Sequence, residues 1–205
     1  MGVIVGVDFD NTIASYDALM HRLATEWGLV EAGSQKTKKL IRDAIRQLPD
    51  GEAKWRRLQT HCYGAGINDA PAMDGVQRFF ASCKARRIPL WIVSHKTRYA
   101  NFGEPVDLRA AALGWLERKG FISSQDFGIG PECVFFGGTR EEKIARIRQL
   151  GITHFVDDLE ETFLESSFPA AVARILFDPE QPPSVTQRWH SFPTWAEIER
   201  HLLQH

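Results

Sequence analysis

The feature that most constrains this sequence is a short apolar run that ends in two closely spaced carboxylates. Residues 3–7 are rich in β-branched side chains, which is typical of a buried parallel strand, and Asp8 and Asp10 follow at once. If the chain turns there, both carboxylates face one small volume and repel each other unless a cation intervenes. Taken alone, the pattern also fits one Asp that caps a helix and another that is solvated.

Further apolar runs indicate that this strand belongs to a sheet. Four more strands are predicted at residues 89–93, 133–136, 153–156 and 174–177, and helices at residues 74–86, 108–119, 140–150 and 195–203. Strands that alternate with helices predict an α/β fold with a three-layer, Rossmann-like parallel sheet. Ligands bind beyond the carboxyl ends of such strands, and Asp8, Ser94 and Asp157 all fall there.

The net charge of the chain is too small to attract a polyanionic partner. The chain has 25 basic and 26 acidic residues and a formal charge of −1, so nothing points to nucleic acid or an anionic membrane as a partner. Three cysteines without metal-ligand spacing favour reduced thiols, and the first apolar run is too short for a signal peptide or a membrane span. We therefore expect a cytoplasmic protein; the sequence does not indicate its oligomeric state.

A second acidic pair strengthens the case for a metal site. Asp157 and Asp158 follow the strand at residues 153–156, with Glu160 and Glu161 close behind. Two acidic clusters at parallel strand ends destabilise each other without a cation, and Mg²⁺ prefers such hard oxygen ligands. The alternative for this pair is a solvated acidic loop that opens the next helix.

Two further positions are weak when taken alone. Ser94 ends a strand, where a hydroxyl and nearby backbone N–H groups can hold phosphoryl oxygens, although a Ser that caps a turn is common. Lys143 lies in the first turn of a predicted helix, where its ammonium opposes the helix dipole. Surface lysines often occupy such positions.

Taken together and in this order, these segments resemble the four motifs of the haloacid dehalogenase (HAD) superfamily of aspartate-nucleophile phosphohydrolases. Residues 7–12 (Val-Asp-Phe-Asp-Asn-Thr) resemble its first motif, and residues 92–94 (Ile-Val-Ser) look like its second. Lys143 occupies the place of the third-motif lysine, and residues 155–158 (Phe-Val-Asp-Asp) look like the fourth motif. The first motif is the most specific, and the four motifs span residues 7–158.

The resemblance implies catalytic roles that agree with the chemistry of these side chains. Asp8 is expected to attack phosphorus and form an aspartyl-phosphate, while Asp10 protonates the leaving alkoxide and then activates water. Ser94 and Lys143 are expected to hold and neutralise the phosphoryl oxygens. Thr12 is expected to orient the loop after the first strand by hydrogen bonding and to contribute to substrate binding.

The resemblance also implies a Mg²⁺ site. Asp8, the backbone carbonyl of Asp10, and Asp157 are expected to hold the ion, with Asp158 in support. Asp10 favours phosphate esters, whose leaving group needs a proton, because dehalogenases of this superfamily lack that Asp.

Residues 15–62 have helical spacing and no plausible strand, and they resemble a small helical cap inserted after the first strand. The expected domains are a HAD-like core at residues 1–13 and 73–205 and a cap at residues 14–72. The cap carries a set of basic residues that could contact a second anionic group or form a solvated helix surface: Lys36, Lys38, Lys39, Arg42, Arg46, Lys54, Arg56 and Arg57. His95, Lys96 and Arg98 follow Ser94 and are also expected to bind substrate.

The expected function is Mg²⁺-dependent hydrolysis of a small phosphorylated metabolite, a sugar phosphate or a nucleotide. Two alternatives remain open. One is phosphotransfer to an acceptor other than water, and the other is a catalytically silent binding protein with this fold.

Overall fold

The computed structural model describes residues 2–34, 37–100, 102–103, 105–122, 127–186 and 188–203. The chain forms two compact units, the first made of residues 1–13, 72–96 and 116–205 and the second of residues 14–71 and 97–115. The second unit therefore includes a segment, residues 97–115, that lies outside the predicted cap. That the two units act as core and cap domains stays a prediction.

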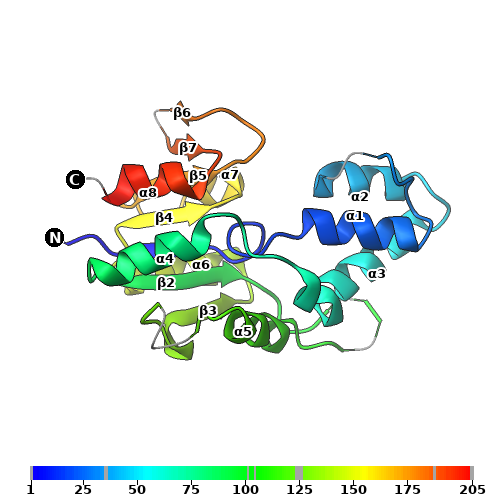
Figure 1. Ribbon diagram of the computed structural model, residues 1–205, viewed down its shortest axis with the longest axis horizontal. Helices are drawn as coiled ribbons and strands as arrows, with labels where there is room; N and C mark the ends of the chain where they lie inside the picture. The colour runs from blue at the N-terminus through cyan, green and yellow to red at the C-terminus, as the bar shows by residue number, and fades with distance from the viewer. Residues whose placement is uncertain are drawn as a thin grey trace. The chain divides into compact units, whose positions relative to one another are not determined.

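The first unit is built on a seven-stranded sheet in the order β3-β2-β1-β4-β5-β7-β6 (Figure 1). All neighbouring strands run parallel except β6 and β7, which pair antiparallel at the edge. The predicted parallel α/β architecture is confirmed. The strands are β1 (Val5–Val7), β2 (Leu90–His95), β3 (Val134–Gly137), β4 (His154–Asp157), β5 (Ala173–Phe177), β6 (Ser184–Val185) and β7 (His190–Phe192).

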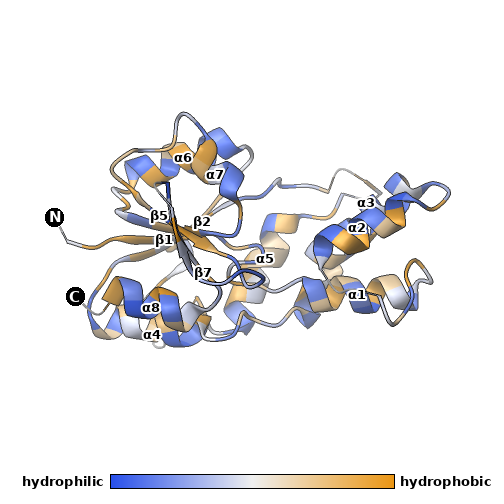
Figure 2. Ribbon diagram, turned by 90° about the horizontal axis from the view of Figure 1, so that it is seen from above, coloured by the Kyte–Doolittle hydropathy of each residue, from blue (hydrophilic) through white to orange (hydrophobic). Residues whose placement is uncertain are grey.

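Helices cover both faces of the sheet, as Figure 2 shows. Helices α6 (Arg140–Gln149) and α7 (Glu160–Leu164) lie on one face, and α4 (Val76–Ala85) and α8 (Trp195–Leu203) on the other. Ile144, Phe155 and Phe163 belong to a buried cluster on the first face. The ring of Trp195 lies 5.0 Å from that of Phe79 on the second face. Apolar side chains on both faces explain why the central strands are almost continuously hydrophobic.

Among the α-helices and strands, three short elements have no counterpart in the sequence prediction: α7, β6 and β7. They contain five, two and three residues, and the two strands lack an apolar run such as the one that reveals the three-residue strand β1. Strand β2 also extends through Ser94 and His95, past its predicted end at residue 93. A short 3₁₀ helix, η2 (Pro131–Cys133), precedes β3.

The second unit is helical, so the predicted helical insertion after the first strand is confirmed. It contains α1 (Asp17–Glu26), α2 (Lys38–Arg46), α3 (Gly51–Tyr63) and the 3₁₀ helix η1 (Ala65–Asp69), and α5 (Leu108–Arg118) begins in it. The Thr37 side chain caps α2 by accepting a hydrogen bond from the Leu40 N–H. Ile45 and Leu58 are fully buried.

Two further expectations from the sequence concern a basic residue of the cap and membrane-spanning segments. Lys36, one of the basic residues of the predicted cap, lies outside the described residues. Across the part of the chain that is described, no helix combines the length and the apolar character needed to cross a bilayer.

The central strand β1 needs glycine at position 6. A Cβ there would lie 2.7 Å from side-chain atoms of Ile152 and Phe155, both buried. We expect Gly6→Ala to lower the free energy of unfolding by about 1–3 kcal/mol, the usual cost of overpacking, as measured by urea denaturation. Gly2→Ala is the matched control, since a Cβ at Gly2 would meet nothing within 4 Å. Equal stability of the two variants would contradict this packing argument.

Candidate active site

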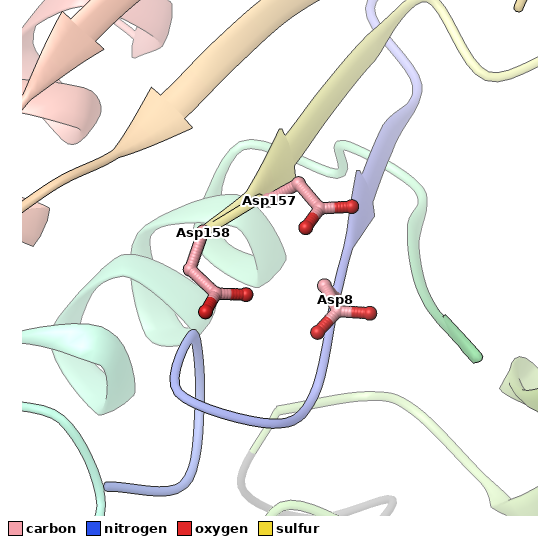
Figure 3. Close-up of side chains that lie close together, drawn as sticks. All are labelled: Asp8, Asp157 and Asp158. Carbon is pink, nitrogen blue, oxygen red and sulfur yellow. The ribbon is translucent and has the colours of Figure 1, made fainter. Parts of the chain in front are cut away.

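Two adjacent parallel strands bring the acidic pairs together. Val7 of β1 is in register with Val156 of β4, and the Asp8 N–H donates to the Val156 carbonyl at 2.9 Å. The carboxylates that follow these strands therefore meet at one sheet edge. Asp8, Asp157 and Asp158 each offer an oxygen within 4.8 Å of the others (Figure 3).

A buried ammonium lies between two of these carboxylates. Lys143 Nζ is 2.6 Å from Asp8 Oδ1 and 2.6 Å from Asp157 Oδ2. Thr139 caps the first turn of α6, since its side chain accepts from the Glu142 N–H. Gly137 permits close approach of this turn to β3, because a Cβ there would lie 3.0 Å from the backbone nitrogen of Lys143. Local capping and close packing thus place Lys143 in the acidic cluster.

The Asp8 carboxyl has a strongly perturbed pKa. Burial is the main cause, and it raises the pKa from 3.8 to about 7; the Lys143 ammonium opposes this shift, whereas the charges of Asp157 and Asp10 add to it. For Lys143, burial acts to lower the pKa. The carboxylates of Asp157 and Asp8 outweigh burial, so the pKa of Lys143 is raised and the side chain stays charged.

These residues fit a divalent cation. When all three carboxyl groups are ionised, they and the one ammonium give a net charge of −2 in a largely buried cluster. Carboxylate oxygens are the ligands that Mg²⁺ prefers, and a dication would neutralise the cluster. Asp8, Asp157 and Asp158 are the side chains that would hold it. The Asp10 carbonyl as a further ligand stays a prediction.

The turn after β1 fixes the position of Thr12. Asn11 has a left-handed backbone (φ 56°), which Asn tolerates better than most residues, and the Ile13 N–H donates to the Phe9 carbonyl at 2.9 Å. Thr12 is fully buried, and its hydroxyl donates to Asp158 Oδ1 at 3.4 Å. Thr12 therefore ties the loop after β1 to the loop after β4.

A second ion pair joins Asp10 to Lys96. Lys96 Nζ lies 2.9 and 2.8 Å from the two carboxylate oxygens of Asp10, and the Lys96 side chain is only 3% exposed. The Lys96 N–H donates to the Gly137 carbonyl at 2.8 Å, which anchors its backbone beside β3. Lys96 is expected from its sequence position to bind substrate, and its pairing with Asp10 was not predicted. No spacing signal indicates the pair, because Lys96 lies one residue beyond the end of β2.

The remaining predicted site residues differ in their surroundings. Ser94 is buried near the carboxyl end of β2, the strand that pairs with β1. His95 is exposed, and its Nε2 lies 3.1 Å from the Gly138 carbonyl oxygen. Arg98 belongs to the second unit, where its Nε donates to Asp107 Oδ2 at 3.1 Å and its side chain is 64% exposed.

The raised pKa of Asp8 has a consequence for stability. Folding raises this pKa from 3.8 to about 7, so the folded protein binds the Asp8 proton more tightly than the unfolded chain does. The resulting contribution to the free energy of unfolding is fully present below pH 3.8 and is lost as the pH rises through about 7. In EDTA, we expect Asp8→Asn to melt at a higher temperature than the wild type at about pH 8, with a difference that shrinks towards about pH 5. Differential scanning calorimetry measures both.

The control for this experiment is Asp74→Asn, which neutralises an exposed carboxylate. Its melting temperature should follow that of the wild type across the same pH range. The expectation is contradicted if the wild type is more stable than Asp8→Asn at alkaline pH. That result would show that the attraction of Lys143 for the ionised Asp8 carboxylate exceeds the free-energy cost of burying it.

Comparisons with known proteins find similarity in structure. No family model and no curated protein sequence matches the chain. A HAD-superfamily hydrolase of subfamily IA, variant 1, from Geobacter sulfurreducens superposes with a TM-score of 0.56 at 14% identity, covering 98% of this chain and 96% of its own. YfnB of Bacillus subtilis, described as a HAD-type hydrolase bound to magnesium, gives a TM-score of 0.56 at 15% identity and 99% coverage of both chains.

A dehalogenase in complex with an intermediate is equally similar, with a TM-score of 0.57 at 13% identity, covering 98% of this chain and 97% of its own. The shared architecture therefore does not separate phosphatases from dehalogenases. All three structures are only 13–15% identical to the chain, so the similarity is one of fold. The chain has the fold of HAD-superfamily hydrolases of subfamily IA.

Proposed function

We propose that this protein is a Mg²⁺-dependent phosphohydrolase that cleaves a small phosphomonoester, a sugar phosphate or a nucleotide. The observation that carries the proposal is the buried Lys143 ammonium, 2.6 Å from both Asp8 and Asp157, with Asp158 beside them. A carboxylate nucleophile, a fixed cation and a hard-oxygen metal site at one sheet edge are the groups that phosphoryl transfer needs.

In the proposed reaction, Asp8 attacks phosphorus and displaces the alcohol, which gives an aspartyl-phosphate and splits one difficult displacement into two. Lys143 stabilises negative charge on the phosphoryl oxygens, and Ser94 binds one of them. When bound, Mg²⁺ supplies positive charge that offsets repulsion between the Asp8 carboxylate and the phosphate. Water then hydrolyses the aspartyl-phosphate and regenerates Asp8.

Asp10 favours a phosphate ester over a halide as the leaving group. An alkoxide needs a proton as it leaves, whereas a halide does not, so an acid/base group two residues after the nucleophile suits ester hydrolysis. Contacts from Lys96 to both oxygens hold the Asp10 carboxylate in one orientation and in its ionised form, which is the form that accepts a proton from the attacking water in the second step. We therefore assign Lys96 as a positioning residue for Asp10.

The cellular setting is part of the proposal. Among the described residues, Cys62, Cys83 and Cys133 are free thiols, and burial raises the pKa of Cys62 and of Cys83 to about 12. Free cysteines, two of them buried and weakly acidic, are typical of cytosolic proteins, so we propose that the enzyme is cytoplasmic.

The proposed function is tested with a panel of sugar phosphates and nucleotides, assayed for phosphate release. We expect turnover with Mg²⁺, none after EDTA treatment and none for Asp8→Asn. Asp10→Asn should lower kcat by about 10²–10⁴, the usual contribution of general acid–base catalysis. Alcohols added as acceptors reveal phosphotransfer if phosphorylated alcohol replaces free phosphate. Failure of the wild type to release phosphate from any compound would contradict the proposal.

The role of Lys96 is tested by a double-mutant cycle. If Lys96 acts through Asp10, Lys96→Gln lowers kcat with little change in KM, and the Asp10→Asn/Lys96→Gln double variant is no slower than Asp10→Asn alone. Lys96→Arg, which can still pair with a carboxylate, should recover part of the rate. A raised KM for Lys96→Gln, with losses that add in the double variant, would indicate contact with substrate instead.

A further inference from the structure

The second unit contains a cavity of about 570 Å³ that the proposed chemistry does not use. All its lining residues belong to that unit: they come from α2 and from α3, together with Thr97, Ala100, Phe102 and Leu108. Cavities of about 300–1,000 Å³ are typical of small-molecule sites in proteins. Its size therefore suits a metabolite, and its lining indicates which kind.

The lining is strongly cationic. Four basic side chains, Lys38, Arg42, Arg46 and Arg56, face a single lining carboxylate, Glu52. The lining therefore carries a net charge of +3, on a chain whose overall formal charge is −1. Such a local excess attracts anions.

The basic residues of α2 destabilise that helix. Lys38, Arg42 and Arg46 are spaced four residues apart, so they lie on one face of α2 and repel one another. At the start of the helix, the Lys38 backbone N–H donates to Asp17 Oδ1 at 3.3 Å. A bound anion would relieve the repulsion among the three basic side chains.

Glu52 pre-orients the two arginines that come from different helices. Its carboxylate lies 2.8 Å from Nε of Arg46 on α2 and 3.2 Å from Nε of Arg56 on α3. Arg42 contacts Asp43, which does not line the cavity, at 2.9 Å. A planar guanidinium held in this way matches phosphate or carboxylate oxygens in a bidentate manner at low entropic cost.

Aromatic side chains line the same cavity. Trp55 is 3% exposed, Tyr63 is the last residue of α3, and Phe102 is 36% exposed. The Thr60 hydroxyl donates to the Phe102 carbonyl at 3.4 Å, which ties that loop to α3. Trp55 is buried and the Lys38 ammonium lies 5.6 Å from the centre of the Tyr63 ring, so Phe102 is the aromatic side chain of this lining that is exposed enough to stack on a flat ring.

We propose that this cavity binds a small organic anion that combines a flat ring with two or more negative charges, such as a nucleoside diphosphate. The competing explanation is a solvated basic helix surface, which accounts for charge but not for aromatic groups and basic groups from two helices around one cavity. The binding site is independent of the proposed function, because it needs neither Asp8 nor a metal ion.

The test is isothermal titration calorimetry of the full chain with ADP in EDTA, so that metal-dependent binding at the acidic cluster is absent. We expect ADP to bind, and Arg42→Gln and Arg46→Gln to weaken its binding at least about tenfold, the loss expected for one charge-assisted hydrogen bond. The matched control is Lys39→Gln, which removes an exposed cation from the same helix but not from the cavity. Lys38→Gln keeps the test decisive if an arginine variant does not fold.

Two partial compounds separate the contributions of charge and ring. Pyrophosphate carries charge without a ring and adenosine a ring without charge, so each should bind more weakly than ADP. Asp8→Asn should bind ADP as the wild type does, which separates this proposal from the proposed hydrolysis. The proposal is overturned if ADP does not bind at about 1 mM, or if Lys39→Gln weakens binding as much as Arg42→Gln does.

Discussion

The position of one ammonium organises the site of this protein. Lys143 lies buried between Asp8 and Asp157, at the ends of two adjacent parallel strands. Without a cation, these carboxylates would repel each other in a region that excludes water. The features around Lys143 serve to bring it there: the capped first turn of α6, the close approach at Gly137 and the register between β1 and β4.

This arrangement leaves the acidic cluster short of positive charge. Burial raises the pKa of Asp8 even though Lys143 contacts it directly, and three carboxylates face one ammonium. A fold optimised for stability alone would bury apolar groups at this position. The retained electrostatic cost is what one expects of a site made to bind a cation and a reacting group. The cavity of the second unit has the opposite imbalance, an excess of cations that disfavours α2.

The sequence predicts the central strands and the longer helices better than it predicts the short elements α7, β6 and β7. The central strands are recovered because each lies in a continuous apolar run, and the longer helices because their apolar positions recur over several turns. The hairpin of β6 and β7 and the short α7 lack such a pattern, and their formation depends on packing against β5 and its neighbours. The site shows the same contrast. The proximity of Asp8 to Asp157 follows from parallel strand ends, whereas the Asp10–Lys96 ion pair depends on side-chain conformations that no spacing rule specifies.

The amino-acid sequence by itself determined the parallel α/β fold, the helical insertion and the acidic residues at the strand ends, because local hydrophobic patterns encode strands, helices and their order. Only the tertiary structure decided that Lys143 bridges two carboxylates, that Lys96 pairs with Asp10, and that Phe102 and Leu108 line one cavity together with α2 and α3. These contacts join residues up to 135 positions apart. Their geometry follows from strand order and helix packing, which one-dimensional patterns constrain but do not specify.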